Sequence, residues 1–463
     1  MSQTNVIRKT PLLPDPAACQ RVAEEMVSYA LAAGADGAEV LLREGAELEV
    51  KVRLGETELV KEAGSRGLGL RVIKNNRVAN THSSDFDATA MKKLAAETVQ
   101  LAELAEPDEF AALPERSEMA RSIPDLGLWD DKVAYLDVQM ALQWAQSAEA
   151  AARGFDKRIT NSDGATFSRV MGASAFVSSA GFSGATRGTY ASGVVRPICD
   201  DADGKKRNGF WWTGSRLAHQ LEEAEAIGKE AARRTVAKIG PRKLATQDCP
   251  VIFPPETAKQ LVGKLAGLAS GGAIWRKSSY FAGREGTQVA APSIFLVDDP
   301  LLPGASGSRA FDGEGLATRP NVIVDAGILK TFLCDTYSGR KLGRPSTGSA
   351  GRGVGGGAYV TTSNLILRPG SMSPEQIAAL DGAFFVTELM GFGFNAVTGD
   401  FSQGAGGFWI EKGEKVFPVS EVTISANFDT LWKRIDAVGN DLDTRTSVHT
   451  PTLRVSSMTV AGT

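Results

Sequence analysis

The three histidines of this chain bear on whether it can bind a catalytic zinc ion. Zinc-dependent hydrolysis needs three protein ligands and an open position for water, and two histidines on neighbouring turns of a helix commonly supply two of them. The chain has His82, His219 and His449, far apart in sequence, and neither H-E-x-x-H nor H-E-x-x-x-H occurs. In the segment from His219 to Glu223 a glutamate stands where the inverted motif H-x-x-E-H has its second histidine. We interpret this segment as part of a glutamate-rich surface helix.

Other groups with chemical potential are less specific. No G-x-S-x-G nucleophile elbow occurs. Acidic residues gather at Asp298-Asp299 and at Asp312-Gly313-Glu314, where carboxylates could bind a hard cation, but the prolines and glycines around them favour turns. Arg352 lies in the glycine-rich run Gly351–Gly357. This run is either a peptide-binding or partner-binding edge or a solvent loop, and both interpretations stay open.

Composition excludes several classes of protein. A chain of 463 residues is expected to form two or three domains, and 43% apolar with 23% charged residues is typical of soluble globular proteins. A net charge of −3 argues against nucleic acid as the main partner. No window approaches the roughly 20 apolar residues of a membrane helix, and Met1–Lys9 lacks an apolar signal core, so export is not expected. Four scattered cysteines suit a reducing cytoplasm.

The elements that must position these side chains indicate an α+β fold. We expect N-terminal α/β units with antiparallel meanders flanked by helices, and then a β-rich C-terminal domain. The expected organisation is an N-terminal extension (1–15), a first α+β unit (16–106), a linker (107–132), a second α+β unit (133–239) and the β-rich domain (245–463).

Local signals define the expected elements. Asp15-Pro16 begins a first helix, because proline suits a first turn, and Asp85 or Asp87 caps a second. Asn75-Asn76 predicts a tight turn, and we expect hairpin geometry at Gly64–Gly69. Short strands are expected at 38–44, 47–53, 57–62 and 68–73, helices at 133–153, 216–239, 256–270 and 374–380, and C-terminal strands at 251–253, 293–297, 322–324, 361–367, 383–389, 408–411, 415–419 and 453–460.

One long stretch resembles a known family. Met390–Gly407 reads MGFGFNAVTGDFSQGAGG and continues into Ile410–Glu414 and Pro418–Ile424. It is similar to the C-terminal signature of the TldD/PmbA metallopeptidase family. Further similar stretches occur in the family's order and extend the resemblance over nearly the whole chain: Gly67–Val72, Ser279–Gly286, Asp298–Pro300 and Phe311–Gly315.

The resemblance implies a cytoplasmic peptidase system of two homologous subunits that acts on unfolded or extended peptides. Members were also once described as modulators of DNA gyrase. The TldD type carries H-E-x-x-x-H and binds zinc, whereas the PmbA (TldE) type lacks the motif. In this chain the motif position falls at Gly263–Leu268, so Gly263 and Leu268 replace the histidines and Lys264 replaces the catalytic glutamate. None of these side chains can ligate zinc or act as a carboxylate base.

We therefore expect a non-catalytic partner that completes a closed chamber, with no catalytic or metal-binding residue of its own and with zinc in a TldD-type partner. A heterodimer with that partner is expected, and a homodimer when the chain is alone. The alternatives are an independent metallopeptidase with an atypical site and a non-proteolytic peptide-binding regulator. Candidate peptide or partner contacts are Arg352, Asn395, Thr398, Asp400 and Ser402.

Overall fold

A computed structural model describes residues 13–202 and 204–462 of the chain. The first helix, α1 (Pro16–Ala32), begins where the sequence predicts it, because the Asp15 carboxylate accepts a hydrogen bond from the Ala17 amide. Asp87 caps α2 (Ala88–Glu103) in the same way. Most of the expected N-terminal extension, residues 1–12, lies outside the described residues.

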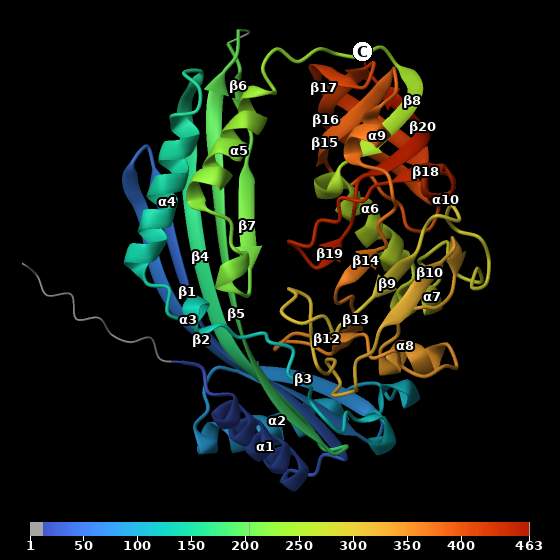
Figure 1. The fold of residues 1–463 in the computed structure, drawn as a ribbon. Coiled ribbons are helices and arrows are strands. Elements are labelled where there is room, and N and C mark those ends of the chain that lie inside the picture. The colour runs from blue at the N-terminus through green and yellow to red at the C-terminus, as the bar shows by residue number, and fades with distance from the viewer. Residues whose placement is uncertain (1–12, 203, 463) are drawn as a thin grey trace, which may run out of the picture.

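A seven-stranded antiparallel sheet dominates the N-terminal half (Figure 1). Its order is β3-β2-β1-β4-β5-β6, with β7 also paired to β5. Strands from both expected α+β units share this sheet, because β1 pairs with β4 from Glu39–Ser178 to Val52–Ala165. The strands are β1 (Gly37–Arg53), β2 (Glu56–Lys74), β3 (Arg77–Ser83), β4 (Ile159–Ser178), β5 (Phe182–Asp200), β6 (Lys206–Asn208) and β7 (Trp211–Ser215).

The long strands correct two expectations. The sequence predicts two strands within Gly37–Arg53 and a hairpin at Gly64–Gly69, but β1 and β2 run through both places without a break. The glycines there meet a need for close backbone approach instead of a turn. A Cβ atom on Gly45 would lie 2.8 Å from the Met171 carbonyl oxygen of the neighbouring strand.

Helices cover one face of this sheet. The even-numbered residues of β1 face them: Val40 and Leu42 pack with α1 and α2, and Leu48, Val50 and Val52 pack with α4 and α5. The predicted helix 133–153 is divided into α3 (Asp131–Ala134) and α4 (Val138–Arg153), and the predicted helix 216–239 begins only at α5 (Ala224–Val236), after a short 3-10 turn at Ala218–Gln220.

The C-terminal half is β-rich, as predicted, and has its own core. One sheet has the order β17-β16-β15-β8-β20-β18, and a pairing of β17 with β20 joins its two sides. Its strands are β8 (Gln247–Phe253), β15 (Ala383–Met390), β16 (Asp400–Glu411), β17 (Glu414–Asn427), β18 (Ile435–Val438) and β20 (Leu453–Ala461).

A second C-terminal sheet and several short helices complete this half. The sheet order is β11-β10-β9-β14-β19, and β12 pairs separately with β13. These strands are β9 (Leu296–Asp298), β10 (Asn321–Asp325), β11 (Ile328–Leu329), β12 (Ala350–Arg352), β13 (Ala358–Val360), β14 (Leu365–Leu367) and β19 (Val448–His449). The helices are α6 (Pro255–Leu268), α7 (Gly271–Trp275), α8 (Thr336–Lys341), α9 (Pro374–Ala378) and α10 (Phe428–Lys433). The α+β fold class is confirmed.

The two halves form two arms that meet at both ends (Figure 1). At the lower end apolar side chains pack across the joint: Leu41, Phe176 and Phe182 of the long sheet contact Phe311 and Val354 of the C-terminal half. At the upper end a single connecting segment, residues 237–246, crosses from α5 to β8. The long sheet thus turns the face opposite its helices toward the C-terminal arm.

Candidate functional site

A cavity of about 520 Å³ lies between the uncovered face of the long sheet and the C-terminal segments 308–313 and 350–352. Its floor includes a row of residues that stand side by side on four strands: Ser65, Gly45, Gly172 and Gly188. Three adjacent glycines leave the backbone of the floor bare. A Cβ atom on Gly172 would lie 2.9 Å from the Glu44 carbonyl oxygen, so the sheet itself needs a residue this small.

Arginines gather on the walls of this cavity. Arg43, on β1, donates from Nη2 to the Arg352 carbonyl oxygen at 3.1 Å. Arg216 lies above Gly188 and donates to the carbonyl oxygens of Ala305 (3.2 Å) and Ser306 (2.8 Å) across the two arms. Burial lowers the pKa of Arg216, and burial likewise lowers the pKa of Arg309, whose guanidinium donates to two carbonyl groups.

Arg352, a predicted contact residue, is a buried part of the joint between the arms. Its side chain is 3% exposed, and its Nη2 lies 2.7 Å from the Glu39 carboxylate. Arg71 approaches the same Glu39 oxygen at 2.8 Å. Burial raises the pKa of Glu39, but the charges and hydrogen bonds of Arg352 and Arg71 outweigh it and hold that pKa below its ordinary value. Arg352 also lines the cavity, but its guanidinium is held in the ion pair with Glu39.

The acidic clusters behave as the turn interpretation predicts. Asp312 accepts hydrogen bonds from the amides of Glu314, Leu316 and Ala350, and Asp298 accepts from the amide and hydroxyl of Ser363. Burial raises the pKa of Asp298 to about 6, and burial together with the charge of Asp312 raises the pKa of Glu314 to about 8. Among the described residues no group of three or more His, Cys, Asp or Glu side chains is arranged to hold a metal ion.

The remaining predicted contacts form one structured loop between β15 and β16. Asn395 accepts hydrogen bonds from the amides of Val397 and Thr398, and the Thr398 hydroxyl donates to Asp400 at 2.7 Å. Ser402 follows on β16. This loop joins β15 and β16, in the upper part of the C-terminal arm, whereas Arg352 ends β12 near the lower joint (Figure 1), so the structure does not bring the five residues together.

The predicted position of the missing zinc motif lies on α6. Leu268 is 1% exposed and packs in the C-terminal core, whereas a Cβ atom on Gly263 or on Gly267 would meet nothing within 4 Å. Lys264 is half-buried, and burial lowers its pKa. The open face of α6 therefore carries two bare glycines and a lysine. The zinc that the family implies does not fit these side chains, because none of them is a metal ligand.

The three histidines do not supply the missing zinc ligands. His449, on β19, is buried, its Nε2 has no hydrogen-bond partner within the described part of the chain, and burial lowers its pKa. His219 is exposed in a 3-10 turn and His82 lies on β3. One buried imidazole does not provide the three ligands that a zinc site needs.

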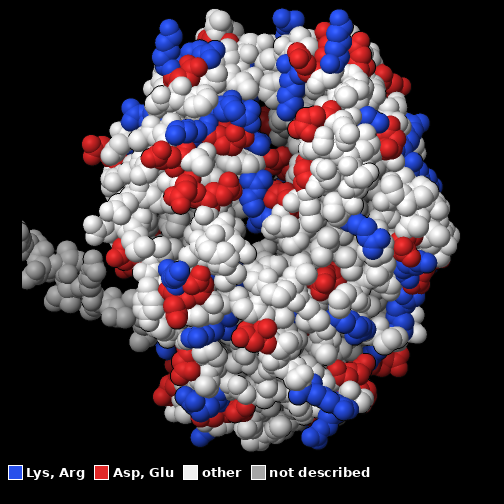
Figure 2. Space-filling model, in the orientation of Figure 1, with Lys and Arg blue, Asp and Glu red and all other residues white. Residues whose placement is uncertain are grey.

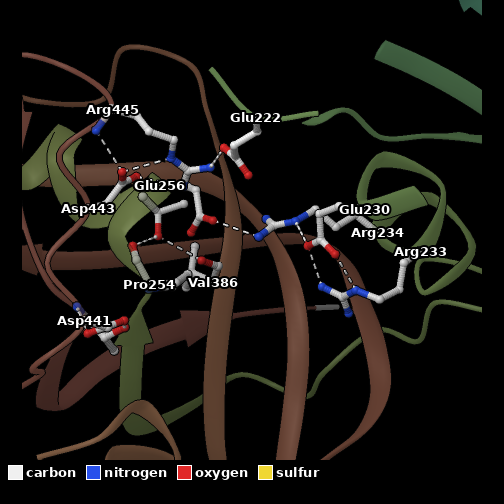
Figure 3. Close-up of polar contacts among 12 residues, drawn as sticks. Glu222, Glu230, Arg233, Arg234, Pro254, Glu256, Val386, Asp441, Asp443 and Arg445 are labelled. Atoms are coloured by element: carbon white, nitrogen blue, oxygen red, sulfur yellow. Dashed lines mark hydrogen bonds and ion pairs between the residues drawn. The ribbon is translucent and has the colours of Figure 1, made fainter. Parts of the chain in front are cut away.

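Ion pairs between the two arms, drawn in Figure 3, hold the arms together. Arg234 of α5 approaches Glu256 of α6 at 2.8 Å, and Arg445 bridges Asp443 of its own arm (2.9 Å) and Glu222 of the other (3.9 Å). Both guanidinium groups lie over the Trp211 ring, at 3.6 and 4.3 Å from its centre. Figure 2 shows the hollow between the arms, with charged side chains of both signs around it.

Sequence reasoning missed the glycine row and the arginines beside it. Gly45, Gly172 and Gly188 are separated by up to 143 positions, since 188 − 45 = 143. Only the strand register places them in one line. The sequence offered one signal for this row, a glycine in the middle of a strand with alternating polarity, because glycine inside a strand marks a place where another backbone approaches closely.

Comparisons with known proteins agree with this architecture. Three family models match: PmbA/TldA metallopeptidase domain 1 (residues 38–102), its central domain (131–239) and its C-terminal domain (246–462). Metalloprotease PmbA of Escherichia coli O157:H7 is 35% identical over 96% of this chain and 97% of that protein. The Metalloprotease PmbA homolog of Haemophilus influenzae is 33% identical over 94% of each chain.

A solved structure has the same fold. A candidate modulator of DNA gyrase from Bacteroides thetaiotaomicron superposes with a TM-score of 0.90 at 26% identity, covering 96% of this chain and 99% of that one. The family models and the two relatives together cover the chain from the first strand to the last. The chain therefore belongs to the PmbA/TldD metallopeptidase family.

Proposed function

We propose that this chain is the metal-free subunit of a two-subunit peptidase and completes the chamber in which a zinc-bearing homologue cleaves extended peptides. One observation carries the proposal. The open face of α6, where the family's motif position falls, presents Gly263, Lys264 and Gly267. Zinc hydrolysis needs three ligands and a base for the bound water, and this face supplies neither.

The arrangement of the arms supports a role in enclosing peptide. The uncovered sheet face and the C-terminal arm leave a cavity of about 520 Å³, within the size range of sites that take small ligands. The floor of the cavity is bare backbone at Gly45 and Gly172, which suits an extended chain lying flat against it. Folded proteins are too large to enter such a space.

Exposed apolar side chains support contact with a second subunit. Phe392 is fully exposed, and Met390 and Val397 are about half exposed, all at or beside the loop that holds the candidate contacts Asn395, Thr398 and Asp400. Clustered exposed apolar side chains mark sites of association. We assign this loop to the contact with a TldD-type homologue in a heterodimer, with zinc bound by that homologue; a homodimer is the state expected without it.

We place this subunit in the cytoplasm. Its four cysteines are free thiols in the structure, as a reducing compartment would require. No helix among the described residues is long and apolar enough to cross a membrane.

The test is reconstitution. The purified chain, a TldD-type homologue with H-E-x-x-x-H, and their mixture are each given an unstructured fluorogenic peptide. The proposal predicts cleavage in the mixture that exceeds the sum of the separate chains, and none when the partner's motif histidines are replaced by alanine. Phe392→Ser should weaken assembly, whereas Val416→Ser, at a half-exposed site on β17, should leave assembly unchanged. Cleavage by the partner that is the same with and without this chain would rule out the proposal.

A further inference from the structure

The cavity beside the glycine row carries a charge that nothing in the proposed function explains. Arg43, Arg216 and Arg309 all line it. Within the described residues none of these three has a carboxylate within 4.0 Å of its guanidinium. The hydrogen bonds of Arg43 and Arg216 go to neutral carbonyl oxygens, so no ion pair neutralises these two charges, whereas the charges of Asp298 and Asp312 offset that of Arg309.

The acidic groups nearby are already engaged. Asp312 is buried and accepts three backbone amide hydrogen bonds. Glu44 accepts from the Asp15 amide, on the helix-covered face of β1. Glu47, two residues beyond Gly45, pairs with Lys61 at 3.6 Å. No carboxylate among the described residues occupies the space between Arg43 and Arg216.

The strand register places the two guanidinium groups on either side of the bare floor. Arg43 is on β1, two residues from Gly45, and points from the same face of the strand. Arg216 lies over Gly188 on β5. β1 and β5 are separated by β4, so the two arginines stand over strands about 10 Å apart. A planar anionic group between them would receive hydrogen bonds from both forks.

The floor indicates that this anionic group belongs to an extended chain. Gly45 and Gly172 expose main chain instead of side chains, beside Gly188 beneath Arg216, which allows another backbone to approach closely. Ser65, at the end of the row, lies on β2 where this strand is an edge, because β3 pairs with β2 only from Leu68 onward. A peptide leaving the cavity at Ser65 meets unpaired strand groups to which it can add.

We propose that this cavity binds a carboxylate group of an extended peptide, held between Arg43 and Arg216 above the glycine row. The proposal rests on the proposed function and specifies the substrate class: peptides that carry acidic residues or end in a free carboxylate. These two sources of the carboxylate share one chemistry, and the experiment separates them.

The test is fluorescence anisotropy of labelled peptides with the isolated full chain. Four unstructured decapeptides are compared: with Glu or with Gln at two central positions, and each with a free or an amidated C-terminus. We expect a peptide bearing a carboxylate to bind about ten- to one-hundred-fold more tightly than the neutral peptide, the factor for a charge-assisted hydrogen bond. Two of the peptides carry only one kind of carboxylate, either the Glu side chains or the free C-terminus; the tighter of these two identifies the source, and salt should weaken binding.

Variants locate the binding. Arg43 is exposed and makes one 3.1 Å hydrogen bond, so Arg43→Gln should fold normally and lose most of the preference for the acidic peptide. Arg216→Lys keeps the positive charge but removes the planar guanidinium group, and should lose part of the preference for the acidic peptide. The matched control is Arg21→Gln, which removes an exposed arginine of α1 and should change nothing.

Equal binding of acidic and neutral peptides, or a preference that survives Arg43→Gln, would overturn the inference. So would phosphate that displaces the peptide at concentrations where sulfate of equal ionic strength has no effect, since the site would then be selective for phosphate. Reconstituted peptidase activity does not enter this readout, so loss of the inference would leave the proposed function standing.

Discussion

Glu39→Gln should destabilise the chain more than almost any other single carboxylate replacement. The Glu39 side chain is 0% exposed and is shared by Arg352 and Arg71 at 2.7 and 2.8 Å. Glutamine is nearly isosteric, so the substitution removes one charge and leaves two guanidinium groups without a counter-ion at the joint of the arms. Breaking a buried ion pair in this way lowers the free energy of unfolding by about 3–5 kcal/mol.

The pH dependence follows from the pKa of Glu39. Its pKa in the folded chain is held below the ordinary 4.5. Its stabilisation is therefore fully present above about pH 4.5 and is lost as the pH falls through the lower, folded-state pKa. The difference in free energy of unfolding between the wild type and Glu39→Gln should be largest at pH 6–7 and should shrink on acidification below pH 4.5.

The assay is urea unfolding followed by circular dichroism at several pH values. The matched control is Glu47→Gln on the same face of β1, where the ion pair with Lys61 is 3.6 Å long and its side chains are 39% and 50% exposed. An exposed pair of this kind contributes about 0–1 kcal/mol. A double replacement of Glu39 and Arg352 by methionine should cost less than the sum of the single replacements. Equal losses of unfolding free energy in Glu39→Gln and Glu47→Gln would refute the buried ion pair. The Arg352 guanidinium could then contact a peptide or a partner instead.

Three further outcomes are expected. Gly172→Val should lower the free energy of unfolding by about 1–3 kcal/mol in urea titrations, because its Cβ would lie 2.9 Å from the Glu44 carbonyl oxygen; an unchanged midpoint would contradict the close strand approach. Glu314→Gln should flatten the pH dependence of stability. Burial raises the pKa of Glu314 from 4.5 to about 8, so between these values the unfolded chain has released the proton while the folded chain still holds it. The free energy of unfolding of the wild type therefore falls by up to about 1.4 kcal/mol for each unit by which the pH rises in this range. Equal slopes for the wild type and the variant would argue against a buried neutral carboxyl group. Arg445→Ala should speed limited proteolysis of the connecting segment 237–246, since it removes the bridge from Asp443 to Glu222, and cleavage at the wild-type rate would show that the bridge does not hold the arms.

Local rules predicted the parts of the fold that local chemistry determines. Proline after Asp15 and the Asp87 cap began their helices where expected. Asn75 and Asn76 both have positive φ, 49° and 59°, as the predicted tight turn requires. The β-rich character of the C-terminal half also followed from its strand and turn signals.

Long-range contacts were beyond such rules. Glu39 and Arg352 are 313 residues apart, and no local sequence pattern around either residue predicts that they form an ion pair. Glycine favours turns by local preference, but Gly45 lies inside β1, because the tertiary pairing of β1 with β4 overrides that preference. Short helices such as α7 and α8 were missed because they are too short for a periodic pattern.

The absence of zinc ligands on α6 was predictable because it depends on residue type alone. No histidine stands between His219 and His449, so no alignment register could place one on Gly263, Lys264 or Gly267. The structure adds the direction in which these residues face, with both glycines toward open space.

The most direct test of the central claim is the zinc content of the purified chain alone, measured by atomic emission after dialysis, together with its cleavage of an unstructured peptide before and after chelation. We expect far less than one zinc per chain and no cleavage that a chelator abolishes. One tightly held zinc per chain, lost together with peptide cleavage on chelation, would contradict it.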